Sequence, residues 1–419
     1  MRVLLIAQYF PPETGAPPNR MISLVEGLLT AGHSVDIVTA KPNHPEGVIW
    51  EGYRKGFVQE RRWNGCRVLY TWVWTSRKRG VGGRIFNYLS FMVTAFIAAL
   101  GLGERPDIVV ASSPPPFVGV TAWALARLNR VPYLLDLRDL WPGLAIALGE
   151  LRNPLAIWLG QNLERFLYRS ADGITTVTAP FIAEIRKISG EETPIRLSMN
   201  GTTLEFTKHD ETRDALRLQR AWADRFVALY AGNVGVCQGL EHIIKAALLT
   251  PEVHFCFLGG GPRKEELMEL AARAGTSNIE FIPRLPQDEA AAWMAAADAL
   301  LVPLASHPMC DIFIPSKLFD SLATGRPVLL SVNGEARRIL EASGGGYYYP
   351  AEDAQALSAA LVALSTQPEM ARAKGQRGRA YAIAHCLRSH QICPMVELAE
   401  HLTGHSKSSR GSREKAATT

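Results

Sequence analysis

Short apolar runs alternate with amphipathic stretches along the chain, and this alternation predicts the fold class. In the first half, strand-like runs rich in Val, Ile and Leu occupy residues 3–10, 34–40, 107–113, 131–137 and 173–179. A helical pattern from about Asn19 to Ala31 separates the first two runs. Strands that alternate with helices are typical of βαβ units, in which helices cover both faces of a parallel sheet.

The same alternation starts again in the second half of the chain. Strand-like runs occupy residues 226–235, 253–262, 279–285, 299–305 and 326–332, and helical patterns such as 239–249 and 263–274 lie between them. We therefore expect an α/β protein with two Rossmann-like domains that face each other across a cleft. In such folds, ligands bind beyond the carboxyl ends of the parallel strands.

The domain limits follow from this restart. We assign residues 1–205 to an N-terminal domain and residues 206–403 to a C-terminal domain, with the last helix as a candidate to pack back on the N-terminal domain. Residues 404–419 are small, polar and basic, and they predict a disordered tail. At 419 residues, of which 47% are hydrophobic, the chain is long enough for two cores and is unlike collagen or a disulfide scaffold.

Charge adds a second feature, which lies in the N-terminal domain. Residues 54–84 contain nine basic residues and one acidic residue, Glu60, although the whole chain has a formal net charge of only +5. Such a segment is typical of a surface that meets anionic lipid or another polyanion. Basic and tryptophan side chains that suit an anionic head-group layer occur together here: Arg77, Lys78, Arg79, Arg84, Trp63, Trp72 and Trp74.

An uncharged stretch of 19 residues, Ile85–Gly103, follows the basic segment. Its length just reaches that of a membrane span. Three interpretations stay open: a buried core helix, a helix that lies on a membrane, and a span. Against a span, the strand pattern of residues 107–113 follows directly and belongs to the same predicted sheet. We therefore expect residues 54–103 to face a membrane.

The cysteines and the first apolar run indicate where in the cell the protein is expected. Six scattered cysteines show no CxxC pair and no zinc-site spacing, so we expect reduced thiols and no metal site. The first apolar run is too short for a secretory signal. We expect a cytoplasmic protein, peripheral on the inner face of the cell membrane, with no nucleic-acid partner.

Candidate chemistry begins in "FIPSKLFDSLATGRPVLL", residues 313–330, which predicts a helix from Pro315 to Gly325. Lys317 lies in its first turn, where a positive charge is unfavourable unless an anion shares the site with the N–H groups of Ser316 and its neighbours. The alternative is that Lys317 extends into solvent. Asp320 lies on the same face and can accept hydrogen bonds from sugar hydroxyls. A diphosphate next to a ribose is the simplest ligand that matches both residues.

Two N-terminal features are candidates to face this ligand or its partner. Gly15, in the loop "YFPPETGAPPNR", allows close approach of backbone to phosphate. Arg138 and Asp139 follow a strand-like run, so they either face a substrate or form a structural ion pair. The loop that contains Gly15 and "GGGPRKEE" both lack GxGxxG, which argues against a dinucleotide-dependent dehydrogenase.

The motifs "YFPPETGAPPNR", "RDLWP", "AGNVGVCQGLEHIIKA", "LGGGPRKEEL" and "IPSKLFDSLATGRPVL", in this order, resemble the family-four retaining glycosyltransferases of GT-B fold. Among these, the chain is most similar to the amino-sugar transferases, fucosamine transferases included, of bacterial O-antigen and capsule synthesis. The resemblance implies a nucleotide-sugar donor on the C-terminal domain, an acceptor on the N-terminal domain, retention of anomeric configuration and no metal.

The resemblance also implies roles for individual residues. The family's Glu-x7-Glu motif would end at Asp320, which would hold the donor's ribose. Its first Glu would fall on Ile312, so the neighbouring Asp311 is the candidate to replace it. The family's Arg and Lys on the diphosphate match the uncharged Asn233 and Gln238. This leaves more of the diphosphate to Lys317, with help from Arg263 or Arg284, while the pair Arg138–Asp139 stands in for the family's sugar-positioning His.

The expected reaction is therefore transfer of a sugar, an N-acetylated hexosamine or deoxyhexosamine, from a UDP-sugar to a saccharide on a lipid such as undecaprenyl diphosphate. Departure of the nucleoside diphosphate would be stabilised electrostatically, with no cofactor besides the co-substrate. Two alternatives stay open: a UDP-sugar 2-epimerase of the same fold, and a non-catalytic subunit that binds sugar nucleotides or membranes. The second follows from the missing Glu, Arg and Lys.

Overall fold

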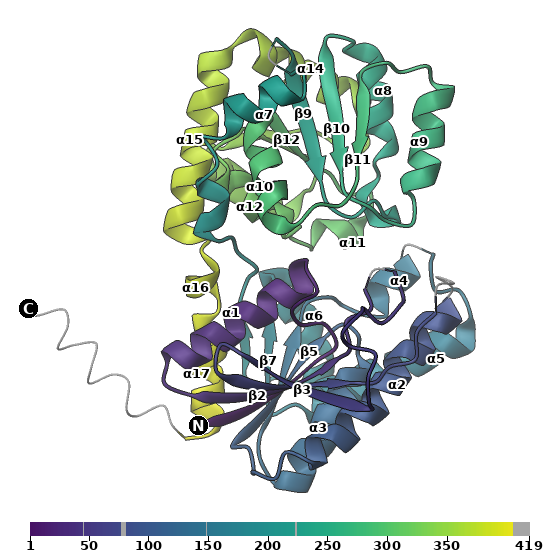
Figure 1. Cartoon of the computed structure of the whole chain (residues 1–419), viewed down its shortest axis with the longest axis vertical. Coiled ribbons are helices and arrows are strands. Elements are labelled where there is room, and N and C mark those ends of the chain that lie inside the picture. Colours follow the sequence, from purple (N-terminus) through teal and green to yellow (C-terminus); the bar gives the residue numbers. More distant parts are fainter. Residues whose placement is uncertain (45, 77–80, 148, 223, 405–419) are drawn as a thin grey trace, which may run out of the picture. The chain divides into compact units, whose positions relative to one another are not determined.

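The chain folds into two compact units (Figure 1). The computed structural model describes residues 1–44, 46–76, 81–147, 149–222 and 224–404. Unit 1 contains Met1–Met199 and the segment from Ile392, and unit 2 contains Asn200–Gln391. The sequence-based limit at 205/206 thus lies within unit 2. Arg77, Lys78, Arg79 and, after Gly404, the predicted tail lie outside the described residues.

Unit 1 is built on an eight-stranded sheet of order β3-β4-β2-β1-β5-β6-β7-β8. The neighbouring strands pair in parallel except for β3 and β4, which form an antiparallel hairpin. The strands are β1 Arg2–Ala7, β2 Ser34–Ala40, β3 Val58–Trp63, β4 Cys66–Thr71, β5 Ile108–Ser113, β6 Tyr133–Leu137, β7 Gly173–Thr176 and β8 Ile195–Leu197.

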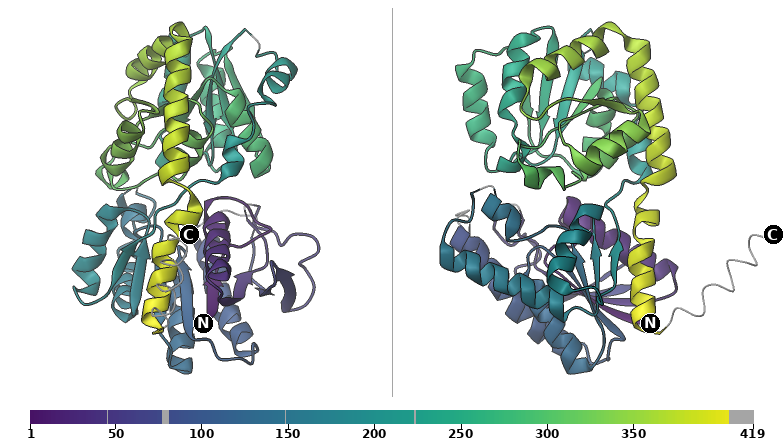
Figure 2. Two further views of the ribbon diagram at one scale, coloured as in Figure 1. Left: turned by 90° about the vertical axis from the view of Figure 1, so that its left-hand side faces the viewer. Right: turned by 180° about the vertical axis from the view of Figure 1, so that it is seen from behind.

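Helices cover both faces of this sheet (Figures 1 and 2). They are α1 Ala16–Thr30, α2 Val81–Leu100, α3 Phe117–Asn129, α4 Gly143–Ala147, α5 Pro154–Ser170, α6 Ala179–Ser189 and α17 Cys393–Leu402. Val3 and Leu5 of β1 join one buried core with α1 and α17. Since side chains alternate along a strand, Leu4 and Ile6 point to the other face, where α3 contacts β1.

The C-terminal helix α17 packs against α1 within unit 1. His33 Nε2 lies 2.9 Å from a carboxylate oxygen of Glu400. Gly27 of α1 has no side chain, and a Cβ there would lie 2.9 Å from Ile392. Met395 of α17 is fully buried in the core of unit 1. The chain therefore returns to unit 1 after completing unit 2.

Unit 2 has a six-stranded, fully parallel sheet of order β11-β10-β9-β12-β13-β14. Its strands are β9 Phe226–Ala231, β10 Val253–Leu258, β11 Ile279–Ile282, β12 Ala299–Val302, β13 Val328–Leu330 and β14 Gly346–Tyr348. Its helices are α7 Arg213–Gln219, α8 Glu241–Leu249, α9 Lys264–Arg273, α10 Gln287–Ala296, α11 Pro308–Asp311, α12 Lys317–Ala323, α13 Gly334–Ser343, α14 Ala354–Thr366, α15 Pro368–His385 and α16 Arg388–Gln391, and short 3-10 turns lie at η1 Leu204–Thr207 and η2 Val236–Gln238. The predicted α/β class with parallel sheets in two Rossmann-like domains is confirmed.

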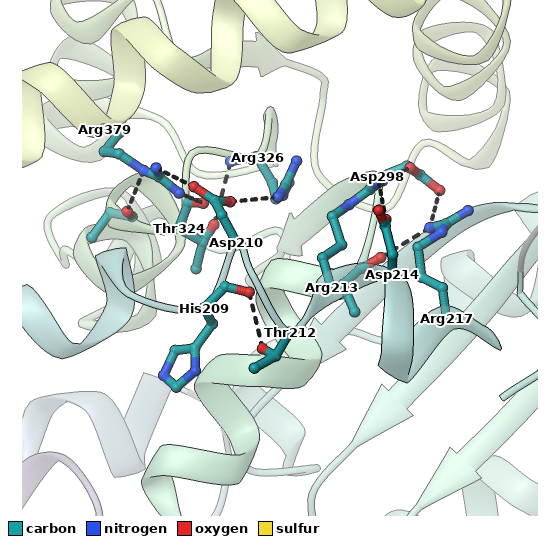
Figure 3. A network of polar contacts seen from close by, with 12 residues as sticks. His209, Asp210, Thr212, Arg213, Asp214, Arg217, Asp298, Thr324, Arg326 and Arg379 are labelled. Atoms are coloured by element: carbon teal, nitrogen blue, oxygen red, sulfur yellow. Dashed lines mark hydrogen bonds and ion pairs between the residues drawn. The ribbon is translucent and has the colours of Figure 1, made fainter. Parts of the chain in front are cut away.

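Ion pairs fasten the start of unit 2 to its body (Figure 3). Asp210 accepts hydrogen bonds from Arg326, at 2.8 Å, and from Arg379 of α15, at 2.5 Å. Asp298 accepts from Arg213 and Arg217 of α7, at 2.7 and 2.9 Å. Burial, together with the charge of the neighbouring Arg213, lowers the pKa of Arg326 to about 10. The pairs of Asp298 thus hold α7 in place, and the pairs of Asp210 hold the segment that precedes it.

The structure excludes one of the three interpretations of the apolar stretch Ile85–Gly103, the membrane span. Among the described residues, one helix is long and apolar enough to cross a membrane, Gly82–Leu100. However, β4 before it and β5 after it belong to the same sheet, so both ends of α2 return to one body. The interpretation as a span is therefore wrong. Phe91 and Ala95 of α2 are buried, whereas Phe86 and Ile97 are exposed, so α2 is a core helix on one side only.

Candidate active site

Closely packed loops form the carboxyl edge of the unit 2 sheet. A Cβ at Gly259, after β10, would lie 2.0 Å from the carbonyl oxygen of Gly232, after β9. A Cβ at Gly261 would lie 2.3 Å from the carbonyl oxygen of Val234. No residue with a side chain fits at these contacts. Glycine therefore lets the two loops pack backbone to backbone where ligands of this fold class bind.

Lys317 points into the first of these loops. It is the first residue of α12, two residues after the predicted start, and its Nζ donates to the Tyr230 hydroxyl at 2.7 Å. The amine also lies 3.9 Å from the centroid of the Tyr230 ring. A Cβ at Gly232 would lie 2.8 Å from Nζ, so the glycine makes room for it. Because Lys317 is half-buried, the alternative that it extends into solvent is wrong.

Burial lowers the pKa of Lys317 to about 7. The amine is therefore close to half protonated at neutral pH, and an anion beside it would favour the charged form. The Tyr230 hydroxyl donates its own proton to the carbonyl oxygen of Asn233, at 2.6 Å. This chain of hydrogen bonds fixes the amine at the loop after β9.

Asn233 and Gln238, which match charged positions of the family, lie in that same loop. Gln238 Oε1 accepts a hydrogen bond from the backbone N–H of Gly235 at 3.1 Å. Asn233 Nδ2 lies 2.7 Å from the position of a Cβ at Gly235. Gln238 thus supports the loop's own conformation, whereas the exposed Asn233 amide lies beside Gly235. Lys317 supplies the positive charge next to Gly232.

Asp320 lies one turn after Lys317 in α12 and is held by the protein. Its Oδ1 accepts a hydrogen bond from Arg388 Nη2 at 3.2 Å, and Thr202 makes a further side-chain hydrogen bond to it. Burial raises the pKa of Asp320 to about 6, and the charge of Arg388 opposes this rise. The sequence did not indicate Arg388 as a partner. The prediction that Asp320 binds ribose stays a prediction.

The partners of Asp320 lie on the two segments that connect the units. Thr202 N donates to the carbonyl oxygen of Cys386 at 2.8 Å, and Arg388 N donates to that of Thr202 at 2.9 Å. Arg388 Nε donates to the carbonyl oxygen of Gly201 at 2.7 Å. A change in the charge or partners of Asp320 therefore acts directly on both connecting segments.

The remaining residues predicted to bind the donor differ in their ion pairs and in their exposure. Asp311 ends α11, and within the described part of the chain its carboxylate makes neither a hydrogen bond nor an ion pair. Arg263 pairs with Glu241, at 2.6 Å, and with Glu266, so two carboxylates compensate its charge. Arg284 is exposed after β11. The two other positions predicted to belong to the donor site are Ile312, which follows α11 and is half-buried, and Ser316, which caps α12.

In unit 1, the strand end that carries the predicted Arg138 and Asp139 also holds a buried ion pair that the sequence did not reveal. Arg20 Nε and Nη2 bind the two carboxylate oxygens of Asp136 at 2.8 and 2.6 Å. Ser112 and Thr175 also donate to Asp136. Burial raises the pKa of Asp136, but Arg20 outweighs it and the net pKa is lowered. This fully enclosed pair is structural.

Arg138 and Asp139 do not form the alternative structural pair with each other. Arg138 Nη2 donates to the carbonyl oxygen of Pro114 at 2.5 Å, and its Nε has no partner among the described residues. Burial lowers the pKa of Arg138, while Asp136 and Asp139 oppose this. Burial raises the pKa of Asp139 to about 6. Arg138 and Asp139 thus offer a proton-exchanging carboxyl and a hydrogen-bond donor at a strand end.

Gly15 precedes α1 in a conformation that favours glycine, with φ 123°. The first turn of α1 contains Pro17 and Pro18, which have no N–H group. The N–H of Asn19 already donates to the carbonyl oxygen of Gly15, at 3.1 Å. The start of α1 therefore offers fewer donors to an anion than an ordinary helix start.

The possible metal ligands lie elsewhere. Within the described chain, His254, Cys256 and Glu280 form one group, and Glu205, His209 and Asp288 form another. None of them is a predicted site residue. In the first group, Glu280 already pairs with Arg220, whose charge opposes a bound cation.

Comparison with known proteins gives two family matches. Residues 15–201 match the family described as "Glycosyl transferase 4-like domain". Residues 225–367 match the family described as "Glycosyl transferases group 1". The matches together cover more than half of the chain, one in each half.

Two relatives have similar length. The putative colanic acid biosynthesis glycosyl transferase WcaI of Escherichia coli K12 is 26% identical over 335 residues, which are 78% of this chain and 82% of WcaI. The probable glycosyltransferase WbjE of Pseudomonas aeruginosa is 26% identical over 280 residues, which are 64% of this chain and 70% of WbjE.

Solved structures share the fold at lower identity. Sucrose-phosphate synthase of Thermosynechococcus elongatus superposes with a TM-score of 0.77 at 19% identity, over 96% of this chain and 99% of the synthase. Alr3699/HepE of Anabaena, in complex with UDP, superposes with a TM-score of 0.69 at 15% identity, over 96% of this chain and 100% of HepE. Both likenesses extend over the two units.

Proposed function

We propose, since the chain belongs to the group 1 family of glycosyltransferases with the GT-B fold, that it moves a sugar from a UDP-sugar to a lipid-linked saccharide. The product would be a bacterial surface polysaccharide, an O-antigen or a capsule. The relative WcaI is named for colanic acid biosynthesis, which supports this class of product. The sugar we propose is an N-acetylated hexosamine or deoxyhexosamine, transferred with retention.

The placement of Lys317 carries the proposal for the donor. Its half-buried amine lies beside Gly232 at the carboxyl edge of the sheet, and Asp320 follows one turn later. A cation next to a carboxylate suits a diphosphate next to a ribose. The structural neighbour HepE has been solved with UDP, which supports uridine as the nucleoside.

In the proposed reaction, the bond between the sugar and the diphosphate breaks, and negative charge develops on the departing UDP. Protonated Lys317 stabilises that charge without metal, because the amine is already fixed by Tyr230. Asp311 or the pair Arg138–Asp139 would position the sugar and the acceptor. We further propose that the acceptor is of the undecaprenyl diphosphate type and that the protein works peripherally at the inner face of the membrane. The basic segment 54–84 and the exposed side of α2 support this location.

The test is release of UDP from a panel of UDP-sugars in the presence of bacterial membranes. We expect wild-type protein to release UDP from one donor and to need membranes for it. Lys317→Ala should reduce this rate about a hundredfold, in the range of one lost electrostatic stabiliser. The matched control is Lys245→Ala, an exposed lysine of α8 that should leave the rate unchanged.

Two outcomes would contradict the proposal. Conversion of the donor without membranes and without transfer would indicate an epimerase. UDP-sugar binding, measured as a thermal shift, without turnover on any membrane fraction would indicate a non-catalytic subunit. The uncharged Asn233 and Gln238 favour this second alternative over the first.

A further inference from the structure

Helix α2 exposes an apolar stripe that unit 1 leaves uncovered. Phe86, Val93, Ile97 and Leu100 are 63, 51, 50 and 53% exposed, and their spacing places them along one side of the helix. The opposite side packs into unit 1. Only 28% of the apolar stretch Gly82–Leu100 of α2 is buried in the protein. A helix that is apolar all round normally lies within a protein or in lipid, so a further partner for α2 is expected.

Helix α5 has a second stripe of this kind, which the sequence pattern had not indicated. Leu155, Trp158, Leu159 and Phe166 are 65, 58, 54 and 39% exposed. These residues are spaced three, four, seven or eight positions apart in the sequence, so they also share one side of a helix. Leu167 and Tyr168 face the protein instead.

Helix α3 contacts both α2 and α5. Trp123 of α3 packs edge to face on Phe166 of α5, with ring centroids 4.9 Å apart. Leu128, near the end of α3, is 61% exposed. The exposed apolar side chains of these neighbouring helices form what we call the lipid face: Phe86, Val93, Ile97, Leu100, Leu128, Leu155, Trp158, Leu159 and Phe166.

The charged side chains of these three helices are mostly basic, and the exposed Glu104 that follows α2 pairs with Arg2. Helices α2, α3 and α5 contain a single acidic residue, Glu164. Burial raises the pKa of Glu164 to about 7, while a hydrogen bond with Tyr168 and the charge of Arg165 oppose this rise, so the carboxyl is only about half ionised near neutral pH. Arg84, Arg165 and Arg169 are exposed on α2 and α5. Apolar side chains with a basic border suit an anionic bilayer surface.

We propose that the lipid face seats the protein on an anionic membrane, with α2 and α5 lying in the interface and neither crossing it. A second copy of the chain fits less well, because a face-to-face pair would bring two basic borders together. This inference rests on the proposed function for the need to reach a lipid-linked acceptor. It names the surface that would do so, and it adds α5 to the segment expected from the sequence.

The experiment is flotation of the full chain with phosphatidylcholine vesicles, with and without phosphatidylglycerol. We expect binding to the phosphatidylglycerol vesicles, weakened by added salt. Two double variants test the two helices separately: Val93→Ser with Ile97→Ser in α2, and Trp158→Ser with Leu159→Ser in α5. Each should lower vesicle partitioning at least about tenfold, since each removes two large apolar groups from lipid.

The matched control is Leu248→Ser with Leu249→Ser in α8 of unit 2. These leucines are each 52% exposed, comparable to the test positions, and lie outside the lipid face. The control should bind vesicles as wild type does. Far-ultraviolet circular dichroism and the thermal shift with UDP show whether each variant is folded.

Three results would overturn the lipid face. The first is wild-type protein that does not float with anionic vesicles, and the second is an α5 variant that floats as wild type does. The third is a wild-type dimer, by sedimentation without detergent, that both double variants dissociate. None of these readouts needs turnover. Vesicle binding without any sugar transfer would refute the proposed function alone, and transfer without vesicle binding would refute the lipid face alone.

Discussion

At the scale of single residues, the site depends on a few half-buried polar groups whose partners lie far away in sequence. Lys317 is fixed by Tyr230, 87 residues earlier, and Asp320 by Arg388, 68 residues later. Burial lowers the pKa of Lys317 and raises that of Asp320, and the charge of Arg388 opposes the second shift. The titration of these groups therefore gives direct tests.

The pKa of Lys317, lowered to about 7 by burial, predicts how UDP binding depends on pH. A diphosphate prefers the protonated amine, so the affinity for UDP should fall as pH rises above about 7. Isothermal titration of wild-type protein between about pH 6 and pH 9 measures this. Lys317→Met should bind UDP weakly with a flatter profile, and an equally steep profile in that variant would contradict the role of Lys317.

The lowered pKa of Lys317 also determines how the stability of the fold depends on pH. The unfolded chain holds a proton on Lys317 up to about pH 10.5, whereas the folded chain loses it near pH 7. Between these values the unfolded state binds more protons, so this residue makes stability rise with pH. Donor affinity and the Lys317 contribution to stability should thus change in opposite directions over the same pH range.

Asp320 gives a test of ribose binding. If it accepts hydrogen bonds from ribose hydroxyls, wild-type protein should bind UDP about tenfold more tightly than 2′-deoxy-UDP, the cost of roughly one hydrogen bond to a charged group. Asp320→Asn should reduce that preference while leaving the protein folded. Competition binding with both nucleotides measures it, and an unchanged preference in the variant would assign Asp320 a purely structural role with Arg388.

The pair Arg20–Asp136 predicts a loss of stability. Asp136→Ala leaves the buried guanidinium of Arg20 without its carboxylate, which should lower the free energy of unfolding of unit 1 by about 3–5 kcal/mol. Urea denaturation followed by circular dichroism measures the loss. Glu184→Ala, which breaks an exposed pair with Lys187, is the control and should change stability by less than about 1 kcal/mol.

At the scale of elements, the packed loops after β9 and β10 predict that substitutions at two adjacent glycines differ strongly in their effect on stability. Gly259→Ala places a Cβ against the carbonyl oxygen of Gly232 and strains a residue with φ 142°, so it should cost more than about 3 kcal/mol and disturb UDP binding. Gly260→Ala meets nothing within 4 Å and should be tolerated. Thermal melting with and without UDP compares the two, and equal melting temperatures would contradict the packing argument.

Most elements could be predicted from the sequence because their strands are buried on both faces and read as continuous apolar runs. The strand β3 was missed because "VQERRW" is largely exposed and carries no apolar periodicity. The strands β8 and β14 have three residues each, too few for a pattern. The exposed stripe of α5 was missed because an apolar periodicity does not show which side of a helix meets the sheet.

The candidate site was predictable only in part. Local motifs indicated Lys317 and Asp320, and the structure places Asn233 in the loop beside Lys317. The roles of Tyr230, Gly232 and Arg388 depend on tertiary contacts, which no local pattern contains. Buried Asp136 and half-buried Asp139 looked alike in "LLDLRDLWP", and only the position of Arg20 distinguishes the structural carboxylate from the candidate for chemistry.

At the scale of the whole molecule, the stability of unit 1 depends on the far end of the chain. Met395 of α17 is fully buried in the core of unit 1, so Met395→Ala should lower the stability of unit 1 by about 2–5 kcal/mol. Unit 2 should keep its response to UDP, which a thermal melt with the nucleotide detects. His401→Ala, an exposed position on the same helix, should have little effect.

The two connecting segments are suitable points for recombination during the evolution of the chain. Because unit 1 resumes at Ile392, unit 2 is an insert within it, and its two boundaries lie beside the paired residues Thr202 and Leu387. Recombination at these two neighbouring points would exchange the whole of unit 2, the proposed donor domain, and leave unit 1 intact. Chimeras cut here, with the Asn200–Gln391 cassette taken from a relative, would separate the evolution of donor choice from that of acceptor choice.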